Sequence, residues 1–326
     1  MNAYRMARSR RCRPYGYTLL LLVSFPWQLA GQAVTSNPGA TFSVNADLVV
    51  LNVTARDRAG DFISTLRPED FRVYEDGRPQ EIRLFRHEDI PVTVGLLVDN
   101  SSSMGSKRND VTAAALAFVR SSNPRDEIFI VNFNDRVTFG LPSQELFSAN
   151  PAELERALNH LPPYGMTALY DAIEAGLEHM QKATTGKKVL IVISDGGDNA
   201  SHYKLSQVLE AAERSDVMIY TIGIFDEHNG DQNPRVLRKL ASATGGEAFF
   251  PTESSQMTSI CQRIAADIRH QYTIGYIPSN PKLDNTYRSI RVTVKNPRGG
   301  KVFVRTRDGY IASPRQDSSA DPVGAP

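Results

Sequence analysis

The sequence predicts an α/β fold in which a doubly wound, mostly parallel sheet is inserted between β-rich flanks. Three observations support this prediction. Short apolar runs without alternation occur in the middle of the chain, amphipathic segments of helical length separate them, and alternation with a period of two occurs at both ends. Continuous apolar runs are typical of parallel strands buried on both faces, and their succession with helices indicates βαβ units. With 326 residues, the chain is long enough for two domains.

The central region, residues 91–271, carries the predicted parallel sheet. Its expected strands are residues 94–98, 128–133, 189–193, 217–222 and 248–250. Its expected helices are residues 111–120, 152–160, 168–182, 205–215 and 236–243, followed by one more around Cys261. Cys261 falls on an apolar stripe at helical spacing, so we expect a small buried hydrophobic residue and not a reactive thiol.

The two flanks, residues 40–90 and 272–312, show the period-two pattern of half-buried strands. In the first flank Val49, Leu51 and Val53 alternate with less apolar positions, and a turn at residues 75–77 predicts a hairpin that returns through Ile82 and Leu84. The second flank predicts strands at residues 272–276, 290–294 and 302–305. Neither flank is long enough for a comfortable core, so we expect the two to pack together as one β-sandwich.

The chain begins with the pattern of a secretory signal. Five arginines and no acid precede an apolar run at residues 17–25, and Gly31 to Ala33 offers small residues for cleavage. We therefore expect residues 1–33 to be a signal peptide and the mature chain to be periplasmic or extracellular. The alternative is an uncleaved signal anchor, which is the only membrane contact that we expect. The apolar run at residues 17–25 is, however, shorter than the roughly 20 residues that span a bilayer. Residues 313–326 have the composition of a disordered tail.

The charge of the mature chain argues against nucleic acid as a partner. Removal of residues 1–33 takes away five arginines, which leaves 32 basic and 36 acidic side chains and a net charge of about −4. A basic face for nucleic acid is therefore not expected.

Polar residues with oxygen ligands follow the predicted buried strands. Asp99, Ser101 and Ser103 come directly after the first run, and Asp195 follows the third run. Thr167 opens the helix that precedes the third run. Ligands of doubly wound sheets bind at the carboxyl ends of the strands, and carboxylates with hydroxyls suit Mg²⁺, or else Mn²⁺ or Ca²⁺, better than zinc. The sequence thus predicts a site for one hard divalent cation.

These five residues resemble the metal-ion-dependent adhesion site of the von Willebrand factor type A family. The family pattern is Asp-x-Ser-x-Ser, a later Thr and a later Asp, which here are Asp99, Ser101, Ser103, Thr167 and Asp195. The resemblance covers about residues 91–271. It implies that the three hydroxyls bind the ion directly, that the aspartates act largely through waters, and that an open position accepts an acidic side chain of a partner protein.

The flanks resemble a narrower group of von Willebrand-related proteins, found mainly among exported proteins of acidobacteria. The matching segments are residues 66–71 with 74–77 before the central region, and Tyr-Thr-Ile-Gly-Tyr at residues 272–276 after it. The function of this group is poorly defined, so the match sharpens the expected fold and source and says little about the ligand.

Simpler interpretations exist for several of these residues. Asp99 and Ser101 could cap the helix that begins near Lys107, because Asp and Ser are common N-caps. Asp198 and Asn199 could be further ligands, although turn residues are the favoured interpretation.

For the function, we expect a metal-dependent adhesion or assembly module that is not an enzyme and has no catalytic residues. A structural envelope protein with a stabilising ion is one alternative. A metal-dependent hydrolase is another, but the sequence lacks a Gly-x-Ser-x-Gly elbow, a phosphate-binding glycine loop and a histidine near the serines.

Overall fold

The computed structural model describes residues 48–160, 162–225, 232–253, 255–297 and 299–314, which belong to one compact unit. The predicted signal peptide and most of the predicted tail lie outside the described residues. No helix in these ranges is long and apolar enough to cross a membrane.

A six-stranded sheet forms the centre of the α/β part. Its order is β10-β9-β8-β5-β6-β7, and every neighbouring pair is parallel except β6 with β7. All eight residues of β5 are buried, as expected for a central strand covered on both faces. The predicted mostly parallel sheet is confirmed. The strands are β5 (Val92–Asp99), β6 (Glu127–Phe133), β7 (Val137–Phe139), β8 (Lys187–Ser194), β9 (Met218–Gly223) and β10 (Ala248–Phe249).

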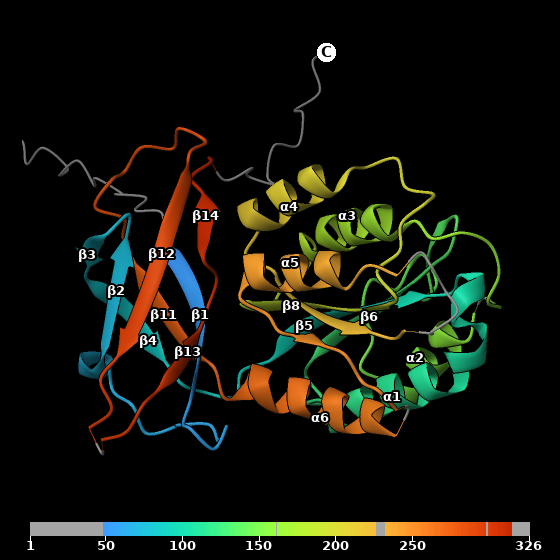
Figure 1. Cartoon of the computed structure of the whole chain (residues 1–326), viewed down its shortest axis with the longest axis horizontal. Helices are drawn as coiled ribbons and strands as arrows, with labels where there is room; N and C mark the ends of the chain where they lie inside the picture. Colours follow the sequence, from blue (N-terminus) through green and yellow to red (C-terminus); the bar gives the residue numbers. More distant parts are fainter. Residues whose placement is uncertain (1–47, 161, 226–231, 254, 298, 315–326) are drawn as a thin grey trace, which may run out of the picture. The chain divides into compact units, whose positions relative to one another are not determined.

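Helices cover both faces of this sheet. Figure 1 shows α1 and α6 on one face and α3, α4 and α5 on the other. The helices are α1 (Arg108–Ser121), α2 (Pro151–Leu158), α3 (Leu169–Met180), α4 (Leu205–Arg214), α5 (Pro234–Thr244) and α6 (Gln256–Arg269), with short 3₁₀ helices at Pro68–Asp70 and Ser102–Lys107. Cys261 is buried in α6, and burial raises the pKa of its thiol to about 12, which agrees with the expected unreactive residue.

The flanks form two antiparallel four-stranded sheets with a shared core. The first sheet has the order β13-β1-β11-β4 and the second β14-β12-β2-β3, so each contains strands from both flanks. Phe71 of the second sheet packs on Tyr272 and Phe85 of the first, with ring centroids 5.1 and 5.4 Å apart. The strands are β1 (Val49–Arg56), β2 (Phe71–Glu75), β3 (Arg78–Gln80), β4 (Ile82–Arg86), β11 (Tyr272–Tyr276), β12 (Tyr287–Val294), β13 (Phe303–Arg305) and β14 (Gly309–Ile311). The flanks therefore pack as one β unit, while the exact domain boundaries stay a prediction.

One predicted connection in the first flank is wrong. The hairpin after β2 returns through β3, whose residues 78–80 pair with residues 73–75. Ile82 and Leu84 instead belong to β4, which crosses to the other sheet and pairs with β11. The two-residue turn at Asp76 and Gly77, both with positive φ, fixes the short return, and the chain then changes sheet.

A buried carboxylate joins the β unit to the α/β part. Asp267 of α6 is fully buried and accepts hydrogen bonds from Thr54 Oγ1 at 3.1 Å and Arg56 Nη2 at 3.1 Å, both from β1. It also binds Arg305 of β13 and accepts a hydrogen bond from Tyr220 Oη of β9 at 2.5 Å. A buried charge is tolerated only when it is paired and hydrogen-bonded, so this cluster ties the last helix to strands of the β unit.

Close packing leaves no room for a side chain at Gly95, in the middle of β5. A Cβ at this position would lie 2.4 Å from Phe129 Cζ and 2.5 Å from Leu190 Cδ2. Both atoms belong to neighbouring strands of the sheet core, so an added methyl group forces these side chains to move.

We therefore expect Gly95→Ala to lower the free energy of unfolding by about 1–3 kcal/mol, as overpacking of a core does. Gly186→Ala is the matched control, because nothing lies within 4 Å of a Cβ there. Urea unfolding measures both variants. Equal stability of the two variants would contradict the tight packing around β5.

Candidate metal centre

The carboxyl ends of β5 and β8 meet at the point where the strand order reverses. The chain passes from β5 to β6 on one side and later from β8 to β9 on the other. Asp99 is the last residue of β5, and Asp195 follows the last residue of β8. Ser194 Oγ donates to Asp99 Oδ2 at 2.7 Å, which joins the two strand ends directly. Doubly wound sheets bind their ligands at such a reversal.

Four of the five predicted ligands form one hydrogen-bonded chain. The N–H of Ser101 donates to Asp99 Oδ1 at 2.9 Å, and the hydroxyls of Ser101 and Ser103 lie 3.1 Å apart. Ser103 Oγ donates to Asp195 Oδ2 at 2.8 Å. The structure thus brings together side chains that are separated by more than 90 residues in the sequence.

Thr167 reaches the same edge through its backbone. Tyr164 N donates to Asn100 O at 2.9 Å, and Ser102 N donates to Gly165 O at 3.2 Å, so this loop lies against the one after β5. On its other side, Thr167 N donates to Asn199 Oδ1 at 2.8 Å. Gly165 has a φ of +81°, which a residue with a side chain rarely adopts, and so permits the turn before Thr167.

Asp198 and Asn199 contribute by holding the backbone. Asp198 Oδ1 accepts hydrogen bonds from Tyr170 N at 3.2 Å and Ser201 Oγ at 2.6 Å, which satisfies the N-terminal end of α3. Asn199 bonds Thr167 twice, because its own N–H also donates to Thr167 O at 3.0 Å. These contacts agree with their interpretation as turn residues and give them a positioning role.

The capping interpretation of Ser101 finds no support. Ser101 precedes the 3₁₀ helix Ser102–Lys107, but its side chain makes no capping hydrogen bond. Its hydroxyl is directed at Ser103 instead.

Burial shapes the electrostatics of this edge. Asp99 is 1% exposed, and Asp195 is also buried. Burial raises the pKa of Asp99 from 3.8 to about 6, against the lowering effect of hydrogen bonds from Ser101 and Ser194. Among the ion pairs of the described residues, none includes Asp99. A buried carboxylate whose partners are hydroxyls and an N–H is the kind of group that a cation stabilises.

The donor set also suits a hard cation. It consists of carboxylate and hydroxyl oxygens, which Mg²⁺, Mn²⁺ and Ca²⁺ prefer. In the part of the chain that the structure describes, no group of three or more His, Cys, Asp or Glu side chains could hold a metal ion. A site built mainly on hydroxyls is compatible with that finding, because Ser and Thr are not among those residue types.

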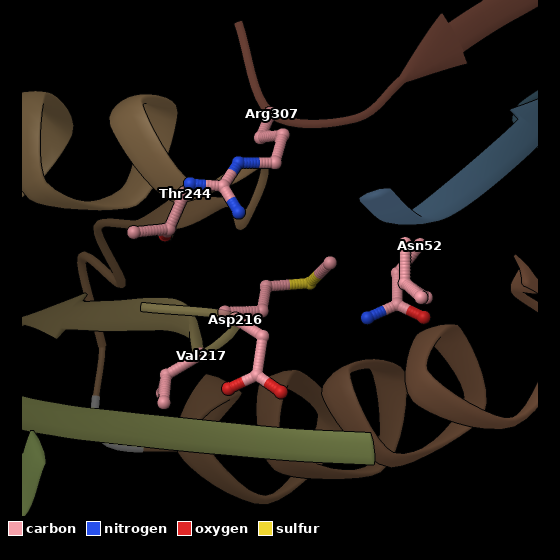
Figure 2. Close-up of a pocket in the computed structure, with 7 residues that line it drawn as sticks. Asn52, Asp216, Val217, Thr244 and Arg307 are labelled. Carbon is pink, nitrogen blue, oxygen red and sulfur yellow. The ribbon is translucent and has the colours of Figure 1, made fainter. Parts of the chain in front are cut away.

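Two cavities elsewhere in the protein are poor alternatives for a functional site. The smaller measures about 10 Å³, which is room for about one water, and Figure 2 shows Asn52, Asp216, Thr244 and Arg307 around it. The larger measures about 290 Å³ and is lined in part by Arg305 and Arg307. Both guanidinium groups already donate to backbone carbonyls there, so they serve the packing of the chain.

A comparison with known protein families shows to which family the chain belongs. Residues 93–263, just over half of the sequence, match the von Willebrand factor type A domain family. The chain belongs to this family. The α/β part is therefore the A domain, and domains of this family bind a divalent metal ion at their metal-ion-dependent adhesion site. They generally act as adhesion or interaction modules.

Several solved structures are similar to the chain. The von Willebrand factor type A protein from Catenulispora acidiphila is 12% identical, with 85% of this chain and 78% of that chain covered and a TM-score of 0.48. The vWF domain of the type V pili tip protein Mfa5 from Porphyromonas gingivalis is 15% identical over 55% of this chain and 95% of that chain, with a TM-score of 0.47. Proximal thread matrix protein 1 from the mussel byssus, with a zinc-occupied MIDAS motif, is 16% identical over 60% and 49%, with a TM-score of 0.49. No curated protein matches the sequence.

The raised pKa of Asp99 predicts a pH dependence of the stability of the metal-free A domain. Burial raises the pKa of Asp99 in the fold above its ordinary value, so the folded state favours the protonated carboxyl. The contribution of protonated Asp99 to stability is fully present below about pH 4 and is lost as the pH rises through about 6. Asp99→Asn cannot ionise, so in EDTA we expect it to exceed the parent in free energy of unfolding by about 1–3 kcal/mol at pH 8. At pH 4 the two should be nearly equal. Urea unfolding at both pH values tests this, and the same difference at both would contradict it.

Proposed function

We propose that the A domain holds one divalent cation with Asp99, Ser101, Ser103, Thr167 and Asp195 and uses it to bind an acidic side chain of a partner protein. The observation that carries the proposal is the chain of hydrogen bonds from Ser194 through Asp99, Ser101 and Ser103 to Asp195. It gathers hydroxyls and carboxylates at the sheet edge where ligands of such folds bind.

Each residue type has a physical reason for its proposed role. The three hydroxyls, of Ser101, Ser103 and Thr167, would bind the ion directly, and the two aspartates would act largely through water. Neutral hydroxyls leave more of the positive charge uncompensated than carboxylates do. The bound ion therefore supplies an electrophilic position for an incoming carboxylate. Mg²⁺ is the ion we propose first, with Mn²⁺ and Ca²⁺ as oxygen-binding alternatives.

A hydrolase is the weaker candidate. Within the described residues, the hydroxyl of Ser103 bonds Asp195 and that of Ser101 lies against Ser103, with no histidine in contact with either. His202 instead binds Asp171, and His179 binds the carbonyl of Leu146. A serine nucleophile is commonly activated by an adjacent histidine, and these contacts provide no histidine.

We expect Asp99→Ala and Thr167→Val each to weaken Mg²⁺ or Mn²⁺ binding by at least about tenfold, the lower end for loss of a group at a metal site. Thr167→Val keeps the side-chain volume and the backbone bonds of Thr167, so it tests the hydroxyl without disturbing the loop. Asp110→Ala, an exposed acid at the start of α1, is the control. Titration calorimetry measures all three, and equal affinity in the parent and both site variants would refute the proposed ligands.

The other alternative is an ion that stabilises the fold without binding a partner. Asp99 is buried, and an ion beside it would offset the cost of burying its charge. Thermal melts with and without EDTA, beside Mg²⁺-dependent capture of proteins from the envelope fraction of the source cell, separate the two. An ion-dependent melting temperature without any ion-dependent capture would favour the structural role.

We further propose that residues 1–33 direct export and are removed, so that the A domain acts in the periplasm or outside the cell. The arginines and the apolar run of this segment support the proposal. Intact mass measurement of the protein from a secreting host should show a chain that begins at Val34. A full-length chain confined to the cytoplasm would contradict it.

A further inference from the structure

Three of the five exposed large apolar side chains of the described A domain lie in the loops that hold the proposed ligands. Tyr164 is 48% exposed, Met166 53% and Tyr203 40%. Two others, Phe139 and Leu146, lie in or just after β7. In the described parts of the helices α1 to α6, no large apolar side chain is exposed to this degree. Apart from Phe139 in β7, the exposed large apolar side chains of the described A domain therefore lie in loops.

Hydrogen bonds hold the backbone of the loops that carry these three residues in place relative to the proposed ligands. Tyr164 and Met166 belong to the loop that carries Thr167, and that loop is bonded to the one after β5. Tyr203 N donates to Asp171 Oδ1 at 3.0 Å in the first turn of α3, two residues after the helix begins. The N–H groups of Asn199 and Ala200 both bond Thr167 O, which links the two loops. A binding surface with fixed loops loses little conformational freedom when a partner binds.

The exposed charges of the described loops at this edge have both signs, so the preference for an acidic partner rests on the proposed ion. Arg136 and Lys204 are exposed in these loops, and Lys107 is half-buried. Among the described carboxylates of these loops, Asp135 is exposed and Asp198 is half-buried. Asp99 and Asp195 are buried, and the proposed divalent ion would offset their charge.

We propose that Tyr164, Met166 and Tyr203 form a specificity surface for a protein segment in which an acidic residue is flanked by apolar side chains. This inference rests on the proposed function, since the acidic residue is the one that the ion would bind. Tyrosine and methionine are enriched at protein interfaces, and tyrosine often carries much of the binding energy. The carboxylate provides the metal-dependent part of recognition, and the apolar neighbours on either side distinguish one acidic segment from another.

The test uses the full chain, immobilised, and a phage library of short random peptides selected in Mg²⁺ and in EDTA. Three proteins are compared: the parent, a variant with Tyr164→Ser, Met166→Ser and Tyr203→Ser, and a matched control with Ile277→Ser, Leu283→Ser and Tyr287→Ser. The control residues are exposed to a similar degree but lie in the β unit. Calorimetry with Mg²⁺ alone shows that each protein retains its ion affinity.

We expect Mg²⁺-dependent enrichment of peptides with Asp or Glu beside apolar residues, reduced about tenfold or more in the loop variant and unchanged in the control. Enrichment of acidic peptides without apolar neighbours, or equal binding by all three proteins, would overturn this inference and leave the proposed function standing. Loss of all Mg²⁺-dependent enrichment from the parent would overturn both. Binding of the parent to anionic phospholipid vesicles in EDTA, lost in the loop variant, would assign the surface to a membrane and also overturn it.

Discussion

The burial of negative charge at the reversal of the strand order constrains the rest of the A domain. Asp99 ends β5 and Asp195 follows the adjacent parallel strand β8, so both carboxylates are buried at the same edge of the sheet. Such a pair is stable only if other groups compensate it. The Ser101 and Ser103 hydroxyls, the Ser101 N–H and Ser194 Oγ provide part of that compensation.

The loop that carries Thr167 is held between two other loops at the same edge of the sheet. Its residues bond the loop after β5 on one side and the loop after β8 on the other. Among the described contacts of Asn199 are two hydrogen bonds that orient the backbone of Thr167. Groups of this kind fix the direction of a ligand side chain without touching the ion, and at metal sites they matter nearly as much as the ligands.

The sequence predicted the sheet and its helices well, because apolar runs of β5, β8 and β9 and the stripes of the helices are strong signals. It also predicted that the flanks would pack together. It missed β7 and β14, each three residues long, since so short a strand has no readable period. The return through Ile82 and Leu84 failed for a related reason: β3 contains Pro79 and only three residues, so the longer apolar pattern of β4 attracted the assignment.

The candidate site could be predicted from the sequence because Asp99, Ser101, Ser103 and Asp195 follow buried strands and, together with Thr167, occur in the order of a known family pattern. The cluster around Asp267 could not be predicted in this way, although Asp267 is buried as deeply as Asp99. Its members come from β1, α6, β9 and β13, and each occupies an ordinary position in its own element. Only the three-dimensional arrangement reveals that Thr54, Arg56 and Arg305 share one carboxylate.

The pairing of β4 with β11 has a mechanical consequence. The chain leaves the β unit after β4 and returns to it at β11, and these two strands are hydrogen-bonded neighbours. The first and last described residues, Leu48 and Pro314, adjoin β1 and β14 in the same unit. The A domain is thus joined to the β unit through two neighbouring strands of one sheet. While the β unit stays folded, a force between the ends at β1 and β14 need not pass through the A domain.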